Sequence, residues 1–379
     1  MVKTGIDRIF DYLDLFEGKR IGLITNPTGV NKDLVSTIDI LNEHTNLVAL
    51  FSPEHGIRGD IQAGVKLDSY KDSKTGIMVY SLYGESRSPS KEMMDKIDVL
   101  VFDIQDVGAR YYTYLYTMAY ALMACEKYNK RVVVLDRPNP VDAIHIEGNI
   151  LNLECRSFVG YYPIPIRYGL TIGELAILFN KEFEIGSDLK IIEMEGYDRS
   201  MNYLDTGLDW IMPSPNIPTP LTAYAYLATC IFEGTNLSEG RGTTKPFFII
   251  GSPYLDSEFV IEEIKKYSLA GIKFRTIYFT PKFSKYKDEL CQGIELIITD
   301  YINFKPVKTG FILLDIIRKH HKEFSYIEPF TKDGRPFIDL LSGDVLLREN
   351  KLGIEEIIDK MEKDSLSFLK VKRRYHIYD

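Results

Sequence analysis

The sequence predicts an α/β protein with two domains, the first built on a mostly parallel sheet. Its 379 residues exceed the length at which one hydrophobic core usually stops growing, which favours two domains. The first part repeats one pattern, in which a short apolar run is followed by a polar cluster and then a helical segment. After this part the segment 141–169 is irregular and rich in Gly, Pro and aromatic residues, so we expect the domain boundary there.

Five apolar runs are the expected strands. Because they alternate with helical segments and are apolar throughout, they indicate a parallel sheet covered on both faces. Between the last two runs, Tyr112, Tyr116, Ala119 and Met123 recur at helical spacing, which favours a crossover helix with these residues in the core. The runs are RIGLIT (20–25), NLVALF (46–51), GIMVYSLY (76–83), DVLVFDI (98–104) and RVVVLD (131–136).

Each expected strand ends in polar residues that can carry chemistry. In an open parallel sheet, ligands bind outside the carboxyl ends of the strands, so these residues should meet at one edge and form a site. They are Asn26, the pair Glu54–His55, Glu85, Asp103 with Asp106, and Asp136 with Arg137 and Asn139.

The later part of the chain contains three informative stretches. Thr171 and Glu174 form a capping box that predicts a helix start, and GIEEIIDKMEKDSLSFLKVKRRY near the end predicts an amphipathic helix. Between them, FEGTNLSEGRGTTKPF (232–247) is a glycine-punctuated loop dense in donors and acceptors, which suits a polyhydroxylated ligand; a long solvated loop is the alternative. Its polar side chains are Glu233, Asn236, Ser238, Glu239, Arg241, Thr243 and Thr244.

Composition argues against several classes of protein. A formal net charge of -8 disfavours nucleic-acid binding, and no apolar run is long enough to span a bilayer. The N-terminus lacks the features of a secretory signal, so we expect a cytoplasmic protein, or a secreted one if a leader has been removed. No dinucleotide or Walker motif occurs, so no cofactor is expected. The four scattered cysteines favour buried, reduced thiols.

Glu54 and Asp103 carry the sharpest chemical interpretations, and the residues alone leave each open. Glu54, held between Pro53 and His55, suits a general acid whose pKa is raised by apolar walls, or a turn residue that caps a backbone amide. Asp103 lies within an apolar strand, and we expect Arg110 to pair with it, either as part of a site or as a structural ion pair. A metal site would require Glu54, His55 and the strand-end aspartates to converge, and we expect none.

The ordered motifs resemble those of the exo-β-N-acetylmuramidase family, formerly catalogued as a domain of unknown function. They cover nearly the whole chain: GLITNPTGV, LFSPEHGIRGD, SLYGESRSPS, VFDIQDVGARYYTY, LDRPNP, YPIPIRYGLTIGEL, PSPNIPTP and EGTNLSEGRGTTKPF. The resemblance implies a Rossmann-like domain over residues 1–150, a smaller α+β domain over 151–379 that closes the pocket, and release of terminal N-acetylmuramic acid from peptidoglycan-derived saccharides or muropeptides. The chain departs from the family pattern at Tyr168, where relatives tend to carry histidine.

The resemblance also implies roles for individual residues. It makes Glu54 the general acid and Arg241 the partner of the substrate's lactyl carboxylate. The predicted catalytic residues are Glu54, His55, Glu239 and Asp103. The predicted substrate-binding residues are Asn26, Glu85, Arg110, Tyr111, Thr113, Asp136, Arg137, Asn139, Arg167, Glu233, Asn236 and Arg241.

The sequence leaves the mechanism open. Two carboxylates about 5 Å apart would indicate a covalent intermediate, a separation of roughly 6.5–9.5 Å would indicate direct attack by water, and the 2-acetamido group could itself be the nucleophile. Two other classes of function compete with glycoside hydrolysis: a non-catalytic saccharide-binding protein and a metal-assisted hydrolase.

Overall fold

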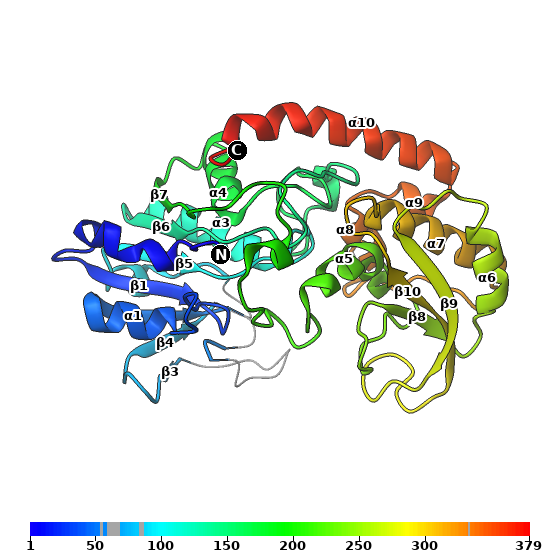
Figure 1. Cartoon of the computed structure of the whole chain (residues 1–379), viewed down its shortest axis with the longest axis horizontal. Helices are drawn as coiled ribbons and strands as arrows, with labels where there is room; N and C mark the ends of the chain where they lie inside the picture. The colour runs from blue at the N-terminus through cyan, green and yellow to red at the C-terminus, as the bar shows by residue number, and fades with distance from the viewer. Residues whose placement is uncertain (54–55, 59–68, 83–86, 333) are drawn as a thin grey trace.

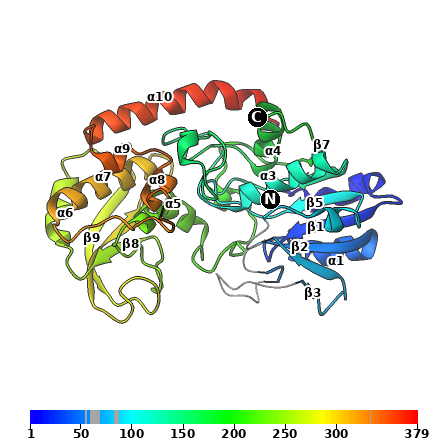
Figure 2. The same ribbon diagram turned by 180° about the vertical axis from the view of Figure 1, so that it is seen from behind.

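The protein is described by a computed structural model that covers residues 1–379, and all of them are described except 54–55, 59–68, 83–86 and 333. The molecule has two parts side by side, one around a larger sheet and one around a smaller sheet, with helix α10 (Ile354–Lys372) lying across both (Figure 1). The same arrangement seen from behind places the C-terminus beside helix α4 of the first part (Figure 2).

The larger sheet has seven strands in the order β3-β4-β2-β1-β5-β6-β7. All neighbouring strands are parallel except β3 and β4, which pair antiparallel at the edge. The expected parallel α/β sheet is therefore confirmed. The strands are β1 (Arg20–Thr25), β2 (Asn46–Ser52), β3 (Tyr70–Lys71), β4 (Met78–Ser81), β5 (Val99–Asp103), β6 (Arg131–Leu135) and β7 (Asp188–Ile192).

Both faces of this sheet are buried, which explains its continuous apolar runs. Successive residues of a strand point to opposite faces, so in β5 Val101 joins the core beside α1 (Thr37–His44), whereas Phe102 joins the core beside α3 (Tyr114–Lys127). Helix α2 (Lys91–Met94) precedes β5, and helix α4 (Ile172–Glu182) begins at the predicted capping box of Thr171 and Glu174. The sheet takes β7 and α4 from beyond residue 150, and the division of the chain at that residue stays a prediction.

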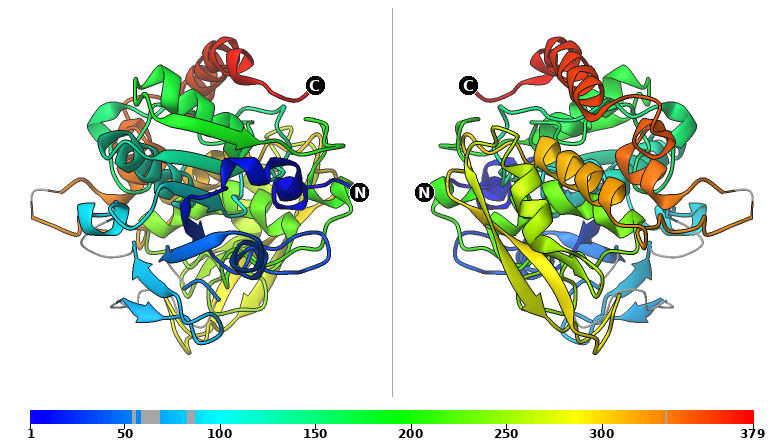
Figure 3. Two further views of the ribbon diagram at one scale, coloured as in Figure 1. Left: turned by 90° about the vertical axis from the view of Figure 1, so that its left-hand side faces the viewer. Right: turned by 90° about the vertical axis from the view of Figure 1, so that its right-hand side faces the viewer.

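The second part is built on a three-stranded antiparallel sheet in the order β8-β10-β9. Its strands are visible in yellow at the end of the molecule away from the N-terminal segment (Figure 3). Helix α6 packs against β9 and β10, and α5 packs against α7. The elements are β8 (Ile249–Ser252), β9 (Ile272–Phe279), β10 (Cys291–Ile298), α5 (Pro220–Thr229), α6 (Ser257–Ile264), α7 (Pro306–His320), α8 (Phe337–Ser342) and α9 (Leu346–Glu349).

Short 3₁₀ helices complete the described secondary structure: η1 (Ile6–Leu15), η2 (Leu153–Cys155), η3 (Tyr203–Thr206), η4 (Cys230–Gly234) and η5 (Arg373–Tyr375). The four cysteines are buried and free, which confirms the prediction of unpaired thiols. Within the described residues, no helix combines the length and apolar character needed to cross a bilayer.

Candidate active site

Hydrogen bonds link the ends of strands β1, β5 and β6 at the carboxyl edge of the larger sheet. The amide oxygen of Asn26 accepts bonds from the N–H (3.0 Å) and hydroxyl (2.5 Å) of Thr28. The Thr28 hydroxyl in turn accepts from the Gln105 N–H at 2.9 Å, and the Gln105 side chain donates to the carbonyl of Pro138 at 2.7 Å. Residues far apart in the sequence therefore meet at this edge, as the strand ends predicted.

Asp103, at the end of β5, is completely buried and forms an ion pair with Arg137 rather than with Arg110. The Arg137 guanidinium donates to its two carboxylate oxygens at 2.5 and 2.9 Å, and Thr37 donates to one of them at 2.5 Å. The predicted pairing with Arg110 is wrong, because that guanidinium donates to backbone carbonyls instead. Both carboxylate oxygens of Asp103 are thus engaged, which favours the structural alternative over its predicted catalytic role.

Asp136 lies at the end of β6 and is also completely buried. One carboxylate oxygen accepts from the Arg137 N–H at 2.9 Å and the Gly173 N–H at 2.7 Å. The other accepts from the hydroxyls of Thr171 (2.7 Å) and Tyr378 (2.6 Å). Burial raises the pKa of Asp136 to about 7, against the opposing effect of these hydrogen bonds. Its interactions anchor α4 and the C-terminal tail.

The side chain of Asn139, two residues beyond Arg137 in the same strand-end segment, also bonds to backbone groups of the protein. It donates to the carbonyl of Leu170 at 2.9 Å and accepts from the N–H of Val141 at 3.1 Å. This side chain therefore holds two segments of the first part together, and its predicted contact with the saccharide stays a prediction.

Asp106 is the buried strand-end carboxylate with the least complete set of partners. One of its oxygens accepts hydrogen bonds from the Tyr168 hydroxyl and, at 2.8 Å, from the Gly108 N–H. The other oxygen, the amide oxygen of Gln105 and the amide nitrogen of Asn26 are buried without a hydrogen bond to any described residue. Burial raises the pKa of Asp106 to about 6. The sequence pattern placed Asp106 among the polar strand ends, but it was not among the predicted catalytic or substrate-binding residues.

A cavity of about 290 Å³ opens where β2 and β4 end and α3 begins. Pro53 and Leu82 line it from the strands, Thr113 and Tyr116 line it from the region of α3, and Phe158 lines it from the irregular segment. The predicted residues Glu54, His55 and Glu85 lie outside the described residues. Pro53, which lines the cavity, immediately precedes Glu54 in the sequence.

In the loop 232–247 two carboxylates and one cation lie in contact, and Lys285 from outside the loop adds a second cation. Arg241 pairs with Glu233 at 2.6 Å and with Glu239 at 3.3 Å, and Lys285 donates to Glu239 at 3.1 Å. Burial raises the pKa of Glu233, and the charge of Glu239 adds to this rise. Glu239 is only 2% exposed, so the alternative of a solvated loop is wrong for this part of it. Sequence reasoning missed Lys285, which lies far along the chain and in no recognisable motif.

Aromatic contacts connect this loop to the edge of the larger sheet. Tyr226 packs edge-on against Tyr111, with ring centroids 5.2 Å apart, and against Phe247, with centroids 4.8 Å apart. Arg241 lies over the Phe247 ring at 5.0 Å. The Tyr111 hydroxyl donates to the carbonyl of Leu227 at 2.7 Å, so this side chain bridges the two parts of the molecule.

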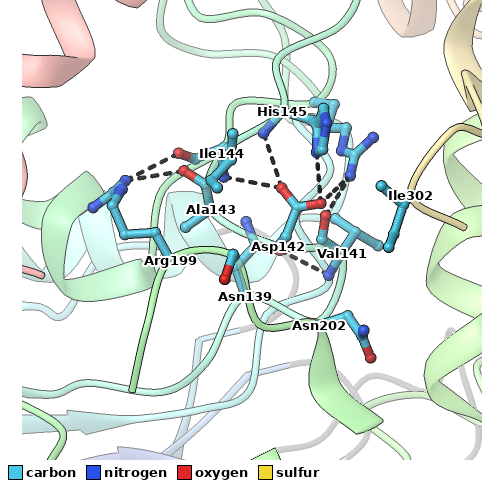
Figure 4. A network of polar contacts seen from close by, with 12 residues as sticks. Asn139, Val141, Asp142, Ala143, Ile144, His145, Arg199, Asn202 and Ile302 are labelled. Carbon is cyan, nitrogen blue, oxygen red and sulfur yellow. Dashed lines mark hydrogen bonds and ion pairs between the residues drawn. The ribbon is translucent and has the colours of Figure 1, made fainter. Parts of the chain in front are cut away.

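Two other predicted substrate-binding residues form several polar contacts within the protein. Arg167 is completely buried and pairs with Asp142 at 2.8 Å and with Glu147 at 2.9 Å. Asp142 also accepts from the backbone N–H groups of Ile144 and His145, which turns this segment around its carboxylate (Figure 4). The amide of Asn236 bonds to Tyr254 and to the backbone at residues 323 and 325. These contacts favour structural roles.

Among the described residues, no three His, Cys, Asp or Glu side chains lie together in a way that could hold a metal ion. The metal alternative centred on Glu54 and His55, which lie outside that part of the chain, so this finding leaves it untested.

The parallel sheet, its polar carboxyl edge and the adjoining cavity define an α/β protein with a ligand site at the strand ends. Two family models match the chain in order: "Exo-beta-N-acetylmuramidase NamZ, N-terminal" over residues 21–221 and "Exo-beta-N-acetylmuramidase NamZ, C-terminal" over residues 224–378. The chain belongs to this family of glycosidases.

Individual relatives resemble the chain over its full length. It is 49% identical to the peptidoglycan β-N-acetylmuramidase NamZ of Bacillus subtilis (strain 168), over 100% of this chain and 91% of that protein. A crystal structure of a DUF1343 family protein from Bacteroides fragilis NCTC 9343 matches with a TM-score of 0.90 and 38% identity, covering 100% of this chain and 99% of that one. A second such protein from the same organism matches with a TM-score of 0.76 and 32% identity, with the same coverage.

Proposed function

We propose that this protein is an exo-β-N-acetylmuramidase that releases terminal β-linked N-acetylmuramic acid from the non-reducing end of peptidoglycan fragments. The observation that carries the proposal is the ordered match of both family models, together with 49% identity to the Bacillus subtilis enzyme along the whole chain. The cavity at the carboxyl edge of the parallel sheet agrees with it, because this is where α/β proteins bind their ligands.

In this proposal Glu54 is the general acid that protonates the departing glycosidic oxygen. Leu82, Tyr116 and Phe158 give the cavity next to Pro53 apolar and aromatic walls, which favour the protonated form of a carboxyl group. Arg87 in the same lining acts in the opposite direction, because a cation favours the carboxylate. His55 would orient the Glu54 carboxyl group, and Glu85 and Thr113 would contact the saccharide. Thr113 supports this assignment, since it lines the same cavity.

Glu239 and Arg241 of the loop 232–247 would bind the terminal sugar from the second part of the molecule. We propose that Arg241 binds the lactyl carboxylate and that Glu239 lies beside the saccharide. Arg241 is paired with Glu233 in the structure, so the incoming carboxylate has to compete with that side chain. The raised pKa of Glu233 favours replacement of this side chain by the substrate, because a protonated carboxyl group is neutral and no longer forms an ion pair with Arg241.

A chromogenic N-acetylmuramide tests the proposal, with the matching N-acetylglucosaminide as the comparison substrate. We expect hydrolysis of the first and much slower hydrolysis of the second. Glu54→Gln should lower kcat by about 10²- to 10⁴-fold while the substrate still binds, since general acid catalysis contributes about that much. Glu239→Gln tests the second predicted carboxylate in the same assay.

The control is Glu262→Gln, the same exchange at an exposed residue of α6, which should leave the rate unchanged. Folded wild-type protein that hydrolyses neither sugar would refute the proposed function. Equal rates for wild type and Glu54→Gln would refute the role of Glu54 alone.

A further inference from the structure

A cavity of about 490 Å³, larger than the one next to Pro53, lies on the smaller sheet. The proposed function gives it no role. Its apolar lining includes Leu221, Phe248 and Ile297, and its charged lining consists of Lys245, Arg275 and Glu295. Ile297 is 39% exposed, an unusual position for an isoleucine on a sheet. The cavity thus combines an apolar floor with a small charged group.

The charged group carries an excess of positive charge. The Glu295 side chain is 4% exposed and pairs with both cations, Lys245 and, at 2.5 Å, Arg275. The side chains of Lys245 and Arg275 are 52% and 58% exposed. One buried carboxylate therefore faces two cations that both reach solvent, so these three groups leave one positive charge available to an anion from outside.

The position of the cavity relates it to the loop that we assign to substrate binding. Lys245 belongs to that loop, and its carbonyl packs so closely on Gly240 that a Cβ there would lie 2.9 Å from it. Gly240 stands between Glu239 and Arg241 in the chain. The cavity therefore begins where the proposed saccharide-binding residues end.

The orientation of the sheet agrees with an open groove at this place. Glu295 and Arg275 are directly opposite each other in the antiparallel pair of β10 and β9, so they share one face of the sheet. Gln292 and Thr276, whose side chains lie on the other face, bond to Ser257 of α6. Lys245, Arg275 and Glu295 are therefore on the side of the sheet that α6 leaves uncovered.

We infer that this groove is a binding site for the departing part of the glycan, in which Lys245 and Arg275 bind the lactyl carboxylate of the next N-acetylmuramic acid unit. The inference rests on the proposed function, and it concerns peptide-free glycan fragments, in which every second sugar carries a free lactyl carboxylate. The apolar floor suits the faces of sugar rings and acetamido methyl groups. Fragments with a second N-acetylmuramic acid unit would then bind more tightly than the disaccharide does.

The experiment compares two peptide-free substrates: the disaccharide with one N-acetylmuramic acid and the tetrasaccharide with two. We expect Lys245→Met to raise KM for the tetrasaccharide by about threefold to fivefold, the effect of a partly exposed charge pair. Its kcat, and both constants for the disaccharide, should stay unchanged, because the groove lies outside the catalytic cavity. Arg275 still pairs with Glu295 in this variant, so the buried carboxylate keeps a partner.

Two further variants separate the effect of charge from the effect of shape. Lys245→Met combined with Glu295→Gln restores the single positive charge and should recover most of the affinity for the tetrasaccharide. Glu295→Gln alone adds a positive charge and should lower its KM below that of wild type. Lys363→Met, at an exposed residue of α10, is the control for loss of a surface lysine and should change neither substrate.

The outcomes are distinguishable. A wild-type protein that cleaves neither substrate would refute the proposed function. A wild-type protein that cleaves both, with a ratio of KM values that the three variants leave unchanged, would overturn this inference alone. A second outcome would also overturn this inference. In it, the internal carboxylate of the tetrasaccharide is reduced to the alcohol, and Lys245→Met still raises KM as much as it does for the native tetrasaccharide.

Discussion

The buried carboxylates at the carboxyl edge of the sheet differ in what surrounds them, and these surroundings separate structural groups from reactive ones. Asp103 has a guanidinium and a hydroxyl on its two oxygens. Asp106 has a tyrosine hydroxyl and one N–H on a single oxygen, and its other oxygen has no partner among the described residues. A buried carboxyl group with few donors is more stable when protonated, and it is the better candidate for a group that meets the ligand.

The stability of the protein should therefore depend on pH through Asp106. Its pKa is about 6 in the folded protein, above the ordinary 3.8, so the contribution of this group is fully present below pH 3.8 and is lost as the pH rises through 6. Between pH 4.5 and 7 we expect wild type to lose about 2 kcal/mol of unfolding free energy relative to Asp106→Asn, at about 1.4 kcal/mol per unit of pKa shift. Urea denaturation at several pH values measures the difference.

Asp98→Asn is the control for the Asp106 experiment. Asp98 is a carboxylate near the surface whose pKa is lowered by its hydrogen bonds to Arg20. A group with a lowered pKa contributes stability above its ordinary pKa of 3.8 and loses it only as the pH falls below that value. The difference between wild type and this variant should therefore stay constant between about pH 4.5 and 7 and shrink below about pH 4. A parallel pH dependence of wild type and Asp106→Asn would contradict the placement of Asp106 in a desolvated site.

At the scale of elements, the helix α10 and the tail that follows it tie the second part of the molecule to the first. Lys372, in the last turn of α10, is buried and donates to the carbonyls of Ala143 (2.7 Å), Ile144 (3.0 Å) and Gly169 (2.6 Å). Beyond it, Tyr378 donates to Asp136 at 2.6 Å and accepts from the Met194 N–H at 2.9 Å. These partners surround the end of β6 and the start of α4.

Replacing Lys372 by methionine should loosen this connection and leave the apolar stem in place. We expect a loss of about 1–2 kcal/mol of unfolding free energy, because the carbonyl of Ile144 loses its donor, whereas Ala143 and Gly169 keep Arg199. Hydrogen exchange should increase at residues 372–379. Lys370→Met, at an exposed position two residues earlier on the same helix, is the matched control, and an equal effect of the two changes would contradict the anchoring role.

The sequence predicted elements better than it predicted partners. The strands predicted over 20–25 and 98–104, the crossover helix and the capping box at Thr171 followed from local periodicity and capping chemistry, which short segments contain in full. The ion pair of Asp103 with Arg137 could not be predicted in this way. Arg110 is nearer to Asp103 in the chain, and only the pairing of β5 with β6 brings the Arg137 guanidinium to Asp103. Lys285 was unpredictable for the same reason, since folding of the second part brings it to Glu239.

At the scale of the whole molecule, one side chain joins backbone segments from both parts. Arg110 is completely buried, and its guanidinium donates to the carbonyls of Asn149 (2.8 Å) and Ile164 (3.0 Å). On the side of the second part it donates to the carbonyls of Leu341 (3.3 Å) and Ser342 (2.7 Å), where α8 ends. Burial lowers the pKa of Arg110 to about 10, so the side chain remains charged at neutral pH. A charge without a carboxylate is stable here because four carbonyl dipoles surround it.

Arg110→Met should therefore weaken the connection between the two parts more than it disturbs either one. The carbonyls of Asn149, Leu341 and Ser342 lose this donor, whereas that of Ile164 keeps the Leu151 N–H at 3.3 Å. At about 1–3 kcal/mol for each unsatisfied group, the loss should reach at least about 3 kcal/mol. In wild type we expect fluorescence of Trp210, the single tryptophan, and far-ultraviolet circular dichroism to report one unfolding transition in urea. In the variant the two signals should separate.

Arg131→Met is the control for loss of an arginine. It removes a side chain that pairs with Asp188 at the surface, where such pairs contribute less than about 1 kcal/mol, and it should leave the transition in place. If Arg110→Met unfolds in one transition at the wild-type urea concentration, the proposed role of Arg110 in joining the two parts is wrong.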